Sequence, residues 1–408
     1  MFLSNSDGTK HQPELSEANV IIHKSRSPIS AMTVTPTSRS PSPDFRQSLP
    51  ECPNGLFNFP LDSVVVTDPD EEILELYMNL ASTSPQLGPR DTDTGGLGFL
   101  DSSSSILELA IDLTPTLPSD FSEAGPSSGS VVGLGDKGKR GKKRTAKVEE
   151  KGVESVEVKI QQDLGMLKGR GGDTGSVLWR SSLHLARLVL SQYHHPPSSS
   201  LPILDTVALR KANILELGAG TGLLAVLLGP LCASYTASDR MENLKLVKRN
   251  LDLNGLGAAG QVPEIGDSHK KDKGPKGGKG QSETKATVRL EEVDWIAVSE
   301  ETKRHRTNSH THDGEEETKY DMILAVDCIY NEHLIQPLVD TLARYCPVGG
   351  KTVVCVVVEL RSADVLTTFL ETWTSDPSGP WTIVRLGEKG LGRWDGKRAR
   401  WVGWVGWR

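Results

Sequence analysis

A glycine-rich turn between an apolar strand and a helix is the part of this sequence whose spacing most clearly suggests chemistry. The strand NILELG leads into residues 216–222 (ELGAGTG), and the helix GLLAVLLGPLC follows directly. Glycines at such a turn remove side chains, so the backbone can bend tightly and a ligand can lie against it. A dinucleotide fingerprint needs a third glycine where Leu223 stands, and the spacing therefore disfavours a pyrophosphate.

Two carboxylates flank this turn and narrow the choice of ligand. Asp239 ends the next strand, SYTASD, about 20 residues after the glycines, where an acid can accept hydrogen bonds from both hydroxyls of a ribose. Glu216 would repel a phosphate but suits a cationic ligand, and the turn has no basic residue. The acids and the spacing together favour S-adenosylmethionine over NAD or ATP. The alternative is a plain strand-to-helix turn whose glycines only permit the bend.

A second candidate site, DCIY at residues 327–330, follows the apolar strand YDMILAV. In a parallel sheet, this strand end lies at the same edge as the glycine turn. A carboxylate at a buried strand end is costly without a partner, and a cationic group would be one. The alternative role of Asp327 is a helix N-cap, for which Asn331 is better placed. Nucleobase amine methyltransferases of such folds resemble one another in an acid or Asn before Pro-Pro and an aromatic residue, so DCIY disfavours a base as substrate.

Other chemically capable residues have simpler explanations. Cys328 is accompanied by no histidine with an orienting partner, so core packing is favoured over nucleophilic catalysis. The five cysteines include no C-x-x-C pair, which predicts reduced thiols. Loop histidines are favoured over a metal site, and no metal is expected. These histidines are His194, His195, His305, His310 and His312.

From residue 212 onward, strands and helices alternate at lengths typical of βαβ units. Right-handed crossovers stack such units as a parallel sheet with helices on both faces, which predicts a doubly wound, Rossmann-like α/β fold. Upstream, we expect a helix over 70–81, a hairpin of strands 105–113 and 153–162, and an amphipathic helix over 176–193. The Trp-rich end, RWVGWVGWR, could stack on RNA bases, but closing strands with a buried aromatic face are favoured.

The remaining chain has the composition of disordered segments. Residues 1–68 are rich in Ser, Pro and Thr, and we predict a disordered tail. Stretches at about 114–151, 264–285 and 299–319 are predicted surface insertions in one domain over 69–408. The net charge of −7 excludes a wholly basic nucleic-acid packaging protein. With no signal peptide or membrane-length apolar run, we expect a cytoplasmic protein; the basic run 137–147 is a nuclear import signal, a ribosome-facing arm or a solvated loop.

The sequence resembles a known family at these motifs. ILELGAGTGLL, Asp239, the pair Asp294-Trp295 and AVDCIY are similar to the seven-β-strand protein-lysine methyltransferases of family 16. Within that family, DEEILELY, GLGFLDSSSSILELAIDL and GGDTGSVLWRSS most resemble the fungal ribosomal lysine N-methyltransferase 5 group. The insertions are longer than in the family, and Val326 stands where a small residue is common. The resemblance implies a seven-stranded class I methyltransferase sheet with an N-terminal strand and helix extension.

The resemblance also implies roles for individual residues. Trp179 would lie beside the methionine part of the cofactor, the backbone of the glycine turn would form its floor, Asp239 would hold the ribose, and Trp295 would cover the adenine. Core packing is the alternative for each tryptophan. The expected cofactor-binding set is Trp179, Glu216, Gly218, Ala219, Gly220, Asp239, Trp295, Ala325 and Val326, and the expected catalytic pair is Asp327 and Tyr330.

The function implied by the resemblance is S-adenosylmethionine-dependent methylation of a lysine in a large-subunit ribosomal protein. The enzyme would act as a monomer, with no membrane partner, and would meet nucleic acid only through the ribosome. One alternative is an interaction module that keeps the cofactor fold, which would need neither Asp327 nor Tyr330. A small-molecule methyltransferase is a further alternative, and a NAD-dependent oxidoreductase comes last because of the glycine spacing.

Overall fold

The structure, a computed structural model, describes most of the chain from residue 49 onward. The described residues are 49–82, 99–101, 103–113, 153–165, 175–198, 200–260, 287–307, 319–391 and 401–408. The predicted tail up to residue 48 and the insertions at 114–151 and 264–285 lie outside them.

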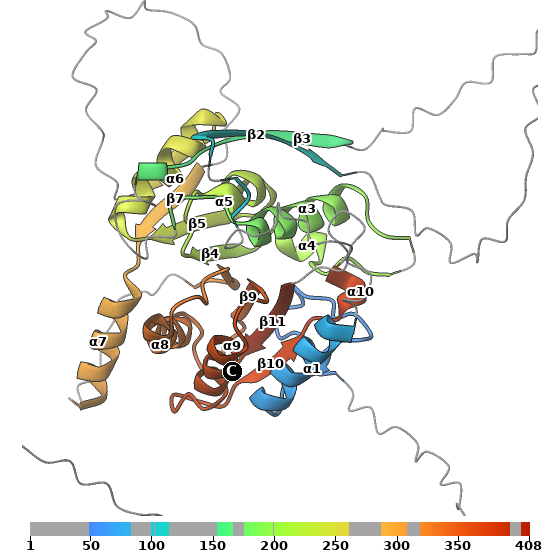
Figure 1. The fold of residues 1–408 in the computed structure, drawn as a ribbon, viewed down its shortest axis with the longest axis vertical. Helices are drawn as coiled ribbons and strands as arrows, with labels where there is room; N and C mark the ends of the chain where they lie inside the picture. Colours follow the sequence, from blue (N-terminus) through green and yellow to red (C-terminus); the bar gives the residue numbers. More distant parts are fainter. Residues whose placement is uncertain are drawn as a thin grey trace, which may run out of the picture. The chain divides into compact units, whose positions relative to one another are not determined.

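Strands and helices alternate along the chain as the sequence pattern predicts (Figure 1). The strands are β1 (Val64–Val65), β2 (Ile106–Asp112), β3 (Ser155–Gln161), β4 (Asn213–Leu217), β5 (Ser234–Asp239), β6 (Gly257–Gly260), β7 (Thr287–Glu292), β8 (Met322–Val326), β9 (Val353–Glu359), β10 (Thr382–Arg385) and β11 (Trp401–Trp407). The helices are α1 (Pro69–Ser82), α3 (Arg180–His194), α4 (Thr206–Leu209), α5 (Leu223–Leu228), α6 (Met241–Leu253), α7 (Trp295–Thr307), α8 (Ile335–Tyr345), α9 (Ala363–Thr374) and α10 (Glu388–Leu391), with short 3₁₀ turns η3 (Gly229–Leu231) and η4 (Glu332–Leu334).

The described strands form one large sheet and a separate hairpin. The order in the sheet is β1-β10-β11-β9-β8-β4-β5-β7-β6. Strands β6, β7, β5, β4, β8 and β9 run parallel, while β11 is antiparallel to both β9 and β10. The predicted seven strands form the centre, and the short strands β1 and β6 add one strand at each edge. The doubly wound α/β fold is confirmed, because the chain leaves β4 toward β5 and later returns on its other side at β8.

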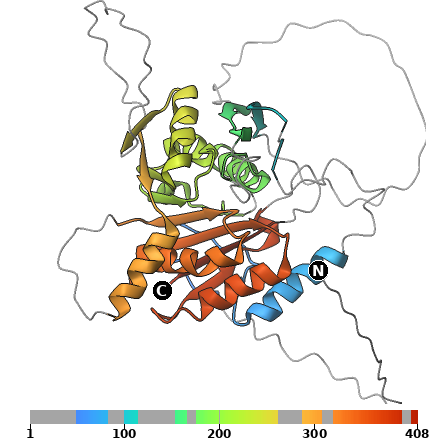
Figure 2. The same ribbon diagram turned by 60° about the vertical axis from the view of Figure 1, so that its left-hand side comes forward.

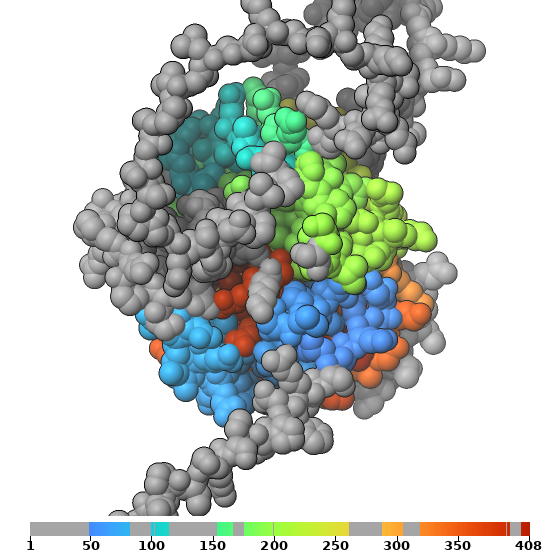
Figure 3. Space-filling model, turned by 90° about the vertical axis from the view of Figure 1, so that its right-hand side faces the viewer, coloured from blue at the N-terminus to red at the C-terminus, as the bar shows by residue number. Residues whose placement is uncertain are grey.

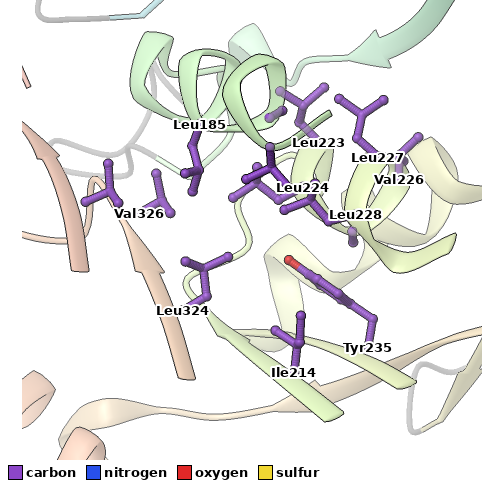
Figure 4. Packing of buried hydrophobic residues seen from close by; sticks show 14 of the residues in the cluster. Leu185, Ile214, Leu223, Leu224, Val226, Leu227, Leu228, Tyr235, Leu324 and Val326 are labelled. Carbon is purple, nitrogen blue, oxygen red and sulfur yellow. The ribbon is translucent and has the colours of Figure 1, made fainter. Parts of the chain in front are cut away.

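Helices cover both faces of this sheet (Figures 1 and 2). One core cluster joins alternate sheet residues, such as Ile214 and Leu324, to α3, α5 and α6. The other joins the intervening residues, such as Leu215 and Ile323, to α8 and α9 with α1. All six residues of α5 are buried between the sheet and α3 (Figure 4). The apolar strands are therefore buried on both faces, as parallel strands require.

The hairpin predicted from two separate sequence segments is present. Strands β2 and β3 pair antiparallel over their full lengths. Two asparagines at the end of α6 bond the free backbone edge of β3. Asn250, in the last turn of the helix, exchanges two hydrogen bonds with Gln161 at 2.7 and 2.9 Å, and the C-cap residue Asn254 exchanges two with Lys159 at 2.7 and 3.0 Å. These amides satisfy edge groups that would otherwise be open to another strand.

The predicted disordered tail is wrong for residues 49–68, which pack against the domain. Leu56 and Phe57 are buried, and the Asn54 side chain donates a 2.8 Å hydrogen bond to the carbonyl of Asp321. Strand β1 then pairs with β10 at the sheet edge. Figure 3 shows this segment and α1 in blue beside the red C-terminal strands. A few apolar side chains are enough to order this stretch, although its average composition is that of the tail.

Helix α1 is tied to the sheet by buried polar contacts. The indole of Trp404 donates a 2.9 Å hydrogen bond to Glu72, and Arg385 pairs with Glu72 at 3.4 Å and with Glu75 at 3.0 Å. Burial raises the pKa of Glu72 above its ordinary value, and Arg385 and Trp404 oppose that rise. The N-terminal extension is thus part of the same core.

Three further expectations are corrected in detail. The amphipathic helix predicted over 176–193 begins only at Arg180, so Trp179 precedes it as the N-cap. The insertion predicted at 299–319 begins later, because α7 continues to Thr307. Strand β11 buries aromatic rings on both faces rather than one: Trp401 lies in the α3 cluster and Trp404 in the α9 cluster. A Cβ on Gly406 would stand 2.4 Å from the Trp373 ring, so this glycine makes room for that packing.

None of the described helices is long and apolar enough to cross a membrane. All five cysteines are free thiols, as the sequence predicts.

Candidate functional site

The glycine turn and DCIY meet at one edge of the sheet. The turn follows β4 and DCIY follows β8, and these two strands are parallel neighbours. The direction of chain winding reverses between them, which is where sheets of this class bind ligands. The structure therefore brings the two predicted sites together.

The glycine turn requires left-handed backbone at two of its expected cofactor contacts. Gly218 and Gly220 have φ of +66° and +56°, a region that favours glycine. A Cβ on Gly218 would lie 3.0 Å from Cys328 Sγ and 3.2 Å from the Trp295 ring, and one on Gly220 would lie 3.2 Å from the Gly175 carbonyl. Ala219 between them is buried, and its N–H donates to the Ser238 carbonyl at 2.9 Å. The turn is thus bare of side chains where a ligand would approach.

Asp239 stands beside the glycine turn with most of its acceptor positions used. Its Oδ2 accepts a 2.8 Å hydrogen bond from the Gly220 N–H, and its Oδ1 accepts from the Arg240 N–H at 2.7 Å and from Asn243 Nδ2 at 2.9 Å. Burial raises the pKa of this carboxyl, and these donors oppose the rise. A carboxylate offers about four lone-pair positions, so Oδ2 has room for one ribose hydroxyl, where the sequence suggested two.

Asn243 offers the second acceptor, and sequence reasoning missed it. The side chain is 3% exposed, and its Oδ1 is buried without a hydrogen-bond partner. The same amide donates to Asp239, and it lies where a Cβ on Gly175 would collide with it, 2.4 Å from Nδ2. A buried polar atom without a partner is uncommon in a native fold. Asp239 and Asn243 therefore present two acceptors at the edge of the turn, the number that a ribose diol needs.

Glu216 is placed differently from the expectation of an acid facing a cationic ligand. The side chain is 3% exposed and its Oε2 accepts a 2.9 Å hydrogen bond from the Tyr235 hydroxyl. Burial raises the pKa of Glu216 to about 8, with the Tyr235 hydrogen bond lowering it and Asp239 raising it. Tyr235 lies among the apolar side chains of α5 and β4 in Figure 4. At neutral pH, Glu216 is mostly protonated in this setting.

Trp295 and Cys328 flank Gly218. Trp295 is the first residue of α7, whose first turn is capped by Asp294 through a 2.9 Å hydrogen bond from the Ile296 N–H. The ring is partly buried against the α8 and α9 core. Burial raises the pKa of Cys328 well above its ordinary value, so its thiol stays protonated and a nucleophilic role is disfavoured.

Ala325 and Val326 end β8 with buried side chains. Ala325 has no exposed surface, and Val326 is 7% exposed and packs with Leu324 in the core that Figure 4 shows. Their side chains are core residues on opposite faces of the sheet, so any contribution at the strand end comes from their backbone.

Asp327 is buried and already paired. Its side chain is 1% exposed, and both oxygens face the guanidinium of Arg361, at 2.7 Å from Nη1 and 2.5 Å from Nη2. The Asp327 backbone has φ of +60°, which a non-glycine residue rarely adopts. Its N–H donates to the Val357 carbonyl at 2.7 Å. The Arg361 guanidinium therefore occupies the position beside Asp327 at which a substrate lysine ammonium was expected.

Arg361 joins three other side chains, and sequence reasoning missed it. It pairs with Glu359 at 3.0 Å as well as with Asp327. Its guanidinium lies 4.8 Å from the centre of the Trp179 ring, a cation–π contact. Trp179 also meets Phe99 edge to face, at 6.1 Å between ring centres. The only sequence signal was a basic residue soon after the apolar strand β9, which is too common to single out.

Tyr330 and Asn331 lie at the outer rim. Tyr330 is 41% exposed, which leaves its ring accessible to a large substrate. Asn331 caps η4 by accepting a 3.1 Å hydrogen bond from the His333 N–H, as predicted. The described residues contain no group of three or more His, Cys, Asp or Glu side chains that could hold a metal ion.

The site can therefore do two things. On the β4–β5 side it offers a bare backbone turn, two oxygen acceptors and an indole, which suits a nucleoside. On the β8–β9 side it offers two carboxylates, one guanidinium and two aromatic rings, which suits a cation such as an amine in its charged form.

Residues 156–264 and 288–375 match a family model described as lysine methyltransferase. The chain is similar to a protein of Schizosaccharomyces pombe named diaminohydroxyphosphoribosylamino-pyrimidine deaminase, with 29% identity over 52% of this chain and 41% of that protein. The chain thus spans about two fifths of that relative. It is also similar to proteins named ribosomal lysine N-methyltransferase 5, with 27% identity in both Zygosaccharomyces rouxii (57% of this chain, 74% of that protein) and Saccharomyces cerevisiae (74% and 88%).

Solved structures give weaker likenesses. An S-adenosylmethionine-dependent methyltransferase, SibL, in its apo form has a TM-score of 0.28 and 15% identity, covering 49% of this chain and 51% of that chain. The N-methyltransferase NodS from Bradyrhizobium japonicum has a TM-score of 0.27 and 13% identity, covering 55% and 92%. At these scores the fold rests on the strand order of the chain itself.

Proposed function

We propose that the chain, whose residues 156–264 and 288–375 match the lysine methyltransferase family model, is an S-adenosylmethionine-dependent enzyme that methylates a lysine of a protein. The observation that carries this proposal is the meeting of a nucleoside-type site and an anionic, aromatic site at the β4–β8 edge. The family match supports the cofactor and the reaction class, and the arrangement of side chains at this edge supports the proposed division into a cofactor side and an amine side.

The cofactor of this family is S-adenosylmethionine, and the residues on the β4–β5 side fit it. The backbone of Gly218 and Gly220 would form the floor; a Cβ at Gly218 would press on Cys328 and Trp295, and one at Gly220 on the Gly175 carbonyl. Asp239 Oδ2 and the partnerless Asn243 Oδ1 would accept from the ribose. Trp295, beside Gly218, would face the adenine. When bound, the cofactor supplies a methyl group on a positively charged sulfur.

The protein contributes alignment and exclusion of water rather than a nucleophile. Transfer of a methyl group to an amine is an in-line displacement, and holding two reactants in line can be worth roughly 7 to 11 kcal/mol. The lysine must reach the methyl group as a neutral amine, and desolvation in the site lowers its pKa. Tyr330 and the carboxylates near Arg361 would orient the amine while its proton leaves to solvent.

We further propose that the substrate is a protein of the large ribosomal subunit. The relatives named ribosomal lysine N-methyltransferase 5 support this choice, including the Saccharomyces cerevisiae protein that aligns over 74% of the chain. Such a substrate would be met in the cytoplasm, or in the nucleus during assembly, and methylation would need only one copy of the chain.

The test is transfer of label from S-adenosylmethionine. Purified protein is incubated with labelled cofactor and with large ribosomal subunits from a Saccharomyces cerevisiae strain that lacks its own ribosomal lysine N-methyltransferase 5. Labelled lysine in one ribosomal protein, absent with Asp239→Ala, supports the proposal. Labelling of another protein keeps the reaction and rejects the ribosomal substrate. Cofactor binding with no labelled protein favours an interaction module.

A further inference from the structure

The cluster around Arg361 carries an unbalanced negative charge. Asp327 and Glu359 are two carboxylates, and Arg361 is the one cation that pairs with either of them among the described residues. A partly buried excess charge of this kind favours the approach of one further cation. Within the described part of the chain, the cluster therefore has one carboxylate more than it has cations, which favours a positively charged substrate group.

The two carboxylates are not equally available to that group. Arg361 binds Asp327 through both oxygens, and the Asp327 side chain is 1% exposed. Glu359 shares only Oε2 with Arg361, at 3.0 Å, and its side chain is 21% exposed. A bidentate guanidinium pair is strong and fixed in geometry. The charge of Asp327 is thus compensated inside the protein, and the uncompensated charge is on Glu359.

The contacts of the Arg361 guanidinium indicate from which side a substrate amine would enter. Arg361 stacks on Trp179 at 4.8 Å, so this ring and the two carboxylates hold it on separate sides. Glu359 ends β9, the parallel neighbour of β8, and so stands at the same sheet edge as Asp327 and the exposed Tyr330. Because Glu359 is the more exposed of the two carboxylates, an amine arriving at this edge would reach Glu359 before it reached Asp327.

We propose that Glu359 is the carboxylate that receives the substrate's lysine ammonium, and that Asp327 and Arg361 are positioning residues that hold Glu359 in place. This inference rests on the proposed lysine methyltransferase function and adds to it the residue that recognises the amine. It reassigns the role that the DCIY motif suggests for Asp327.

The first test measures amine binding without turnover. Saturation-transfer-difference NMR is recorded with the full chain, S-adenosylmethionine and n-butylammonium, which has the charge and chain of a lysine side chain; n-butanol is the neutral control. The expected result is a signal for n-butylammonium with wild type, a weaker signal with Asp327→Asn, whose altered side chain holds Glu359 less firmly, and no signal with Glu359→Gln. No signal with wild type, or a signal that survives Glu359→Gln and disappears with Asp327→Asn, overturns the inference.

The second test uses turnover on the ribosomal substrate. Loss of one charged hydrogen bond to the amine corresponds to about a tenfold rise in KM for the protein substrate, and we expect this with Glu359→Gln while the affinity for the cofactor is unchanged. The control is Glu301→Gln, which makes the same chemical change in an exposed pair with Arg344 at 3.5 Å. Equal KM for wild type and Glu359→Gln contradicts the inference.

A chemical rescue separates positioning from folding. Arg361→Ala removes the guanidinium, and added guanidinium ion should restore part of its kcat, whereas methylammonium should restore less because it cannot bind both Asp327 oxygens. A variant that has lost activity only through misfolding gains nothing from either ion. Absence of any wild-type methyl transfer would reject the proposed function, while the NMR result would still decide the role of Glu359.

Discussion

The two halves of the site differ in how far along the chain their carboxylates find partners. On the β4–β5 side, Asp239 is held by Gly220, Arg240 and Asn243, all within 19 positions. On the β8–β9 side, Asp327 is held by Arg361, 34 positions away and on the far side of β9. The first half is built mainly from local motifs and the second from the topology of the sheet. A motif search therefore finds almost all of the β4–β5 side, the cofactor half, but it finds the β8–β9 side, the acceptor half, without its central cation Arg361.

The largest expected effect is on the acceptor half. Arg361→Met leaves the buried Asp327 carboxylate without its counter-ion, and removing one member of a buried ion pair costs about 3 to 5 kcal/mol of the free energy of unfolding. Urea denaturation of the purified variant measures this loss. The double variant Asp327→Asn/Arg361→Met should recover much of the lost free energy of unfolding, because the uncompensated charge is gone. A double variant as unstable as Arg361→Met would show that packing, not charge, holds this half together.

A pH effect is expected on the cofactor half. The pKa of Glu216 is about 8 in the fold, against 4.5 for its ordinary value. Between these pH values the folded protein keeps a proton that the unfolded chain has lost, so stability falls as pH rises, by up to about 1.4 kcal/mol per pH unit from this group. Glu216→Gln should remove this contribution.

Denaturation of wild type and Glu216→Gln at pH 5.5 and pH 7.5 measures the difference. The free energy of unfolding of Glu216→Gln should increase relative to that of wild type when the pH is raised from 5.5 to 7.5. A constant difference between the two proteins would mean that Glu216 is ionised in the fold, as an acid facing a cationic ligand would be. Calorimetric titration with the cofactor adds a second readout, which Glu216→Gln should leave unchanged if the side chain belongs only to the core.

The smallest expected effect distinguishes the role of the Gly218 backbone as a floor under the cofactor from simple backbone strain. Gly218→Ala should weaken cofactor binding about tenfold, because its Cβ would meet Cys328 and Trp295 at 3.0 and 3.2 Å. Gly255→Ala is the matched control: its φ is +73°, close to the +66° of Gly218, but a Cβ there meets nothing within 4 Å. Both should lose about 1 kcal/mol of stability from strain. Equal cofactor affinity in the two variants would contradict the proposal that the Gly218 backbone forms the floor of the cofactor site.

The sequence predicted the elements whose signals are local. The alternation of strands and helices gave the sheet, and the separated strands 105–113 and 153–162 were expected to pair and do. Residues 49–68 were assigned to the tail because their composition resembles it, although Leu56 and Phe57 are buried. Average composition cannot show that two apolar residues will pack against the surface of the folded domain.

At the site, the missed residues share one cause. Asn243 lies on the buried face of α6 with Leu246 and Val247. Arg361 follows a strand without any motif, and each of the two residues gains its role from the carboxylate that it contacts in the fold. Trp179 was expected on a helix and instead precedes it, where its ring can face Arg361. The spacing of residues indicated which chemistry to look for, and only the arrangement in space shows which groups are already paired.

The most direct test of the account is identification of the methylated residue. Large ribosomal subunits lacking the modification are incubated with the protein and S-adenosylmethionine carrying a deuterated methyl group, and the ribosomal proteins are digested and sequenced by mass spectrometry. The account predicts a deuterated methyl group on a lysine side chain, dependent on Asp239 and reduced with Glu359→Gln. A deuterated methyl group on RNA or on a residue other than lysine would contradict it.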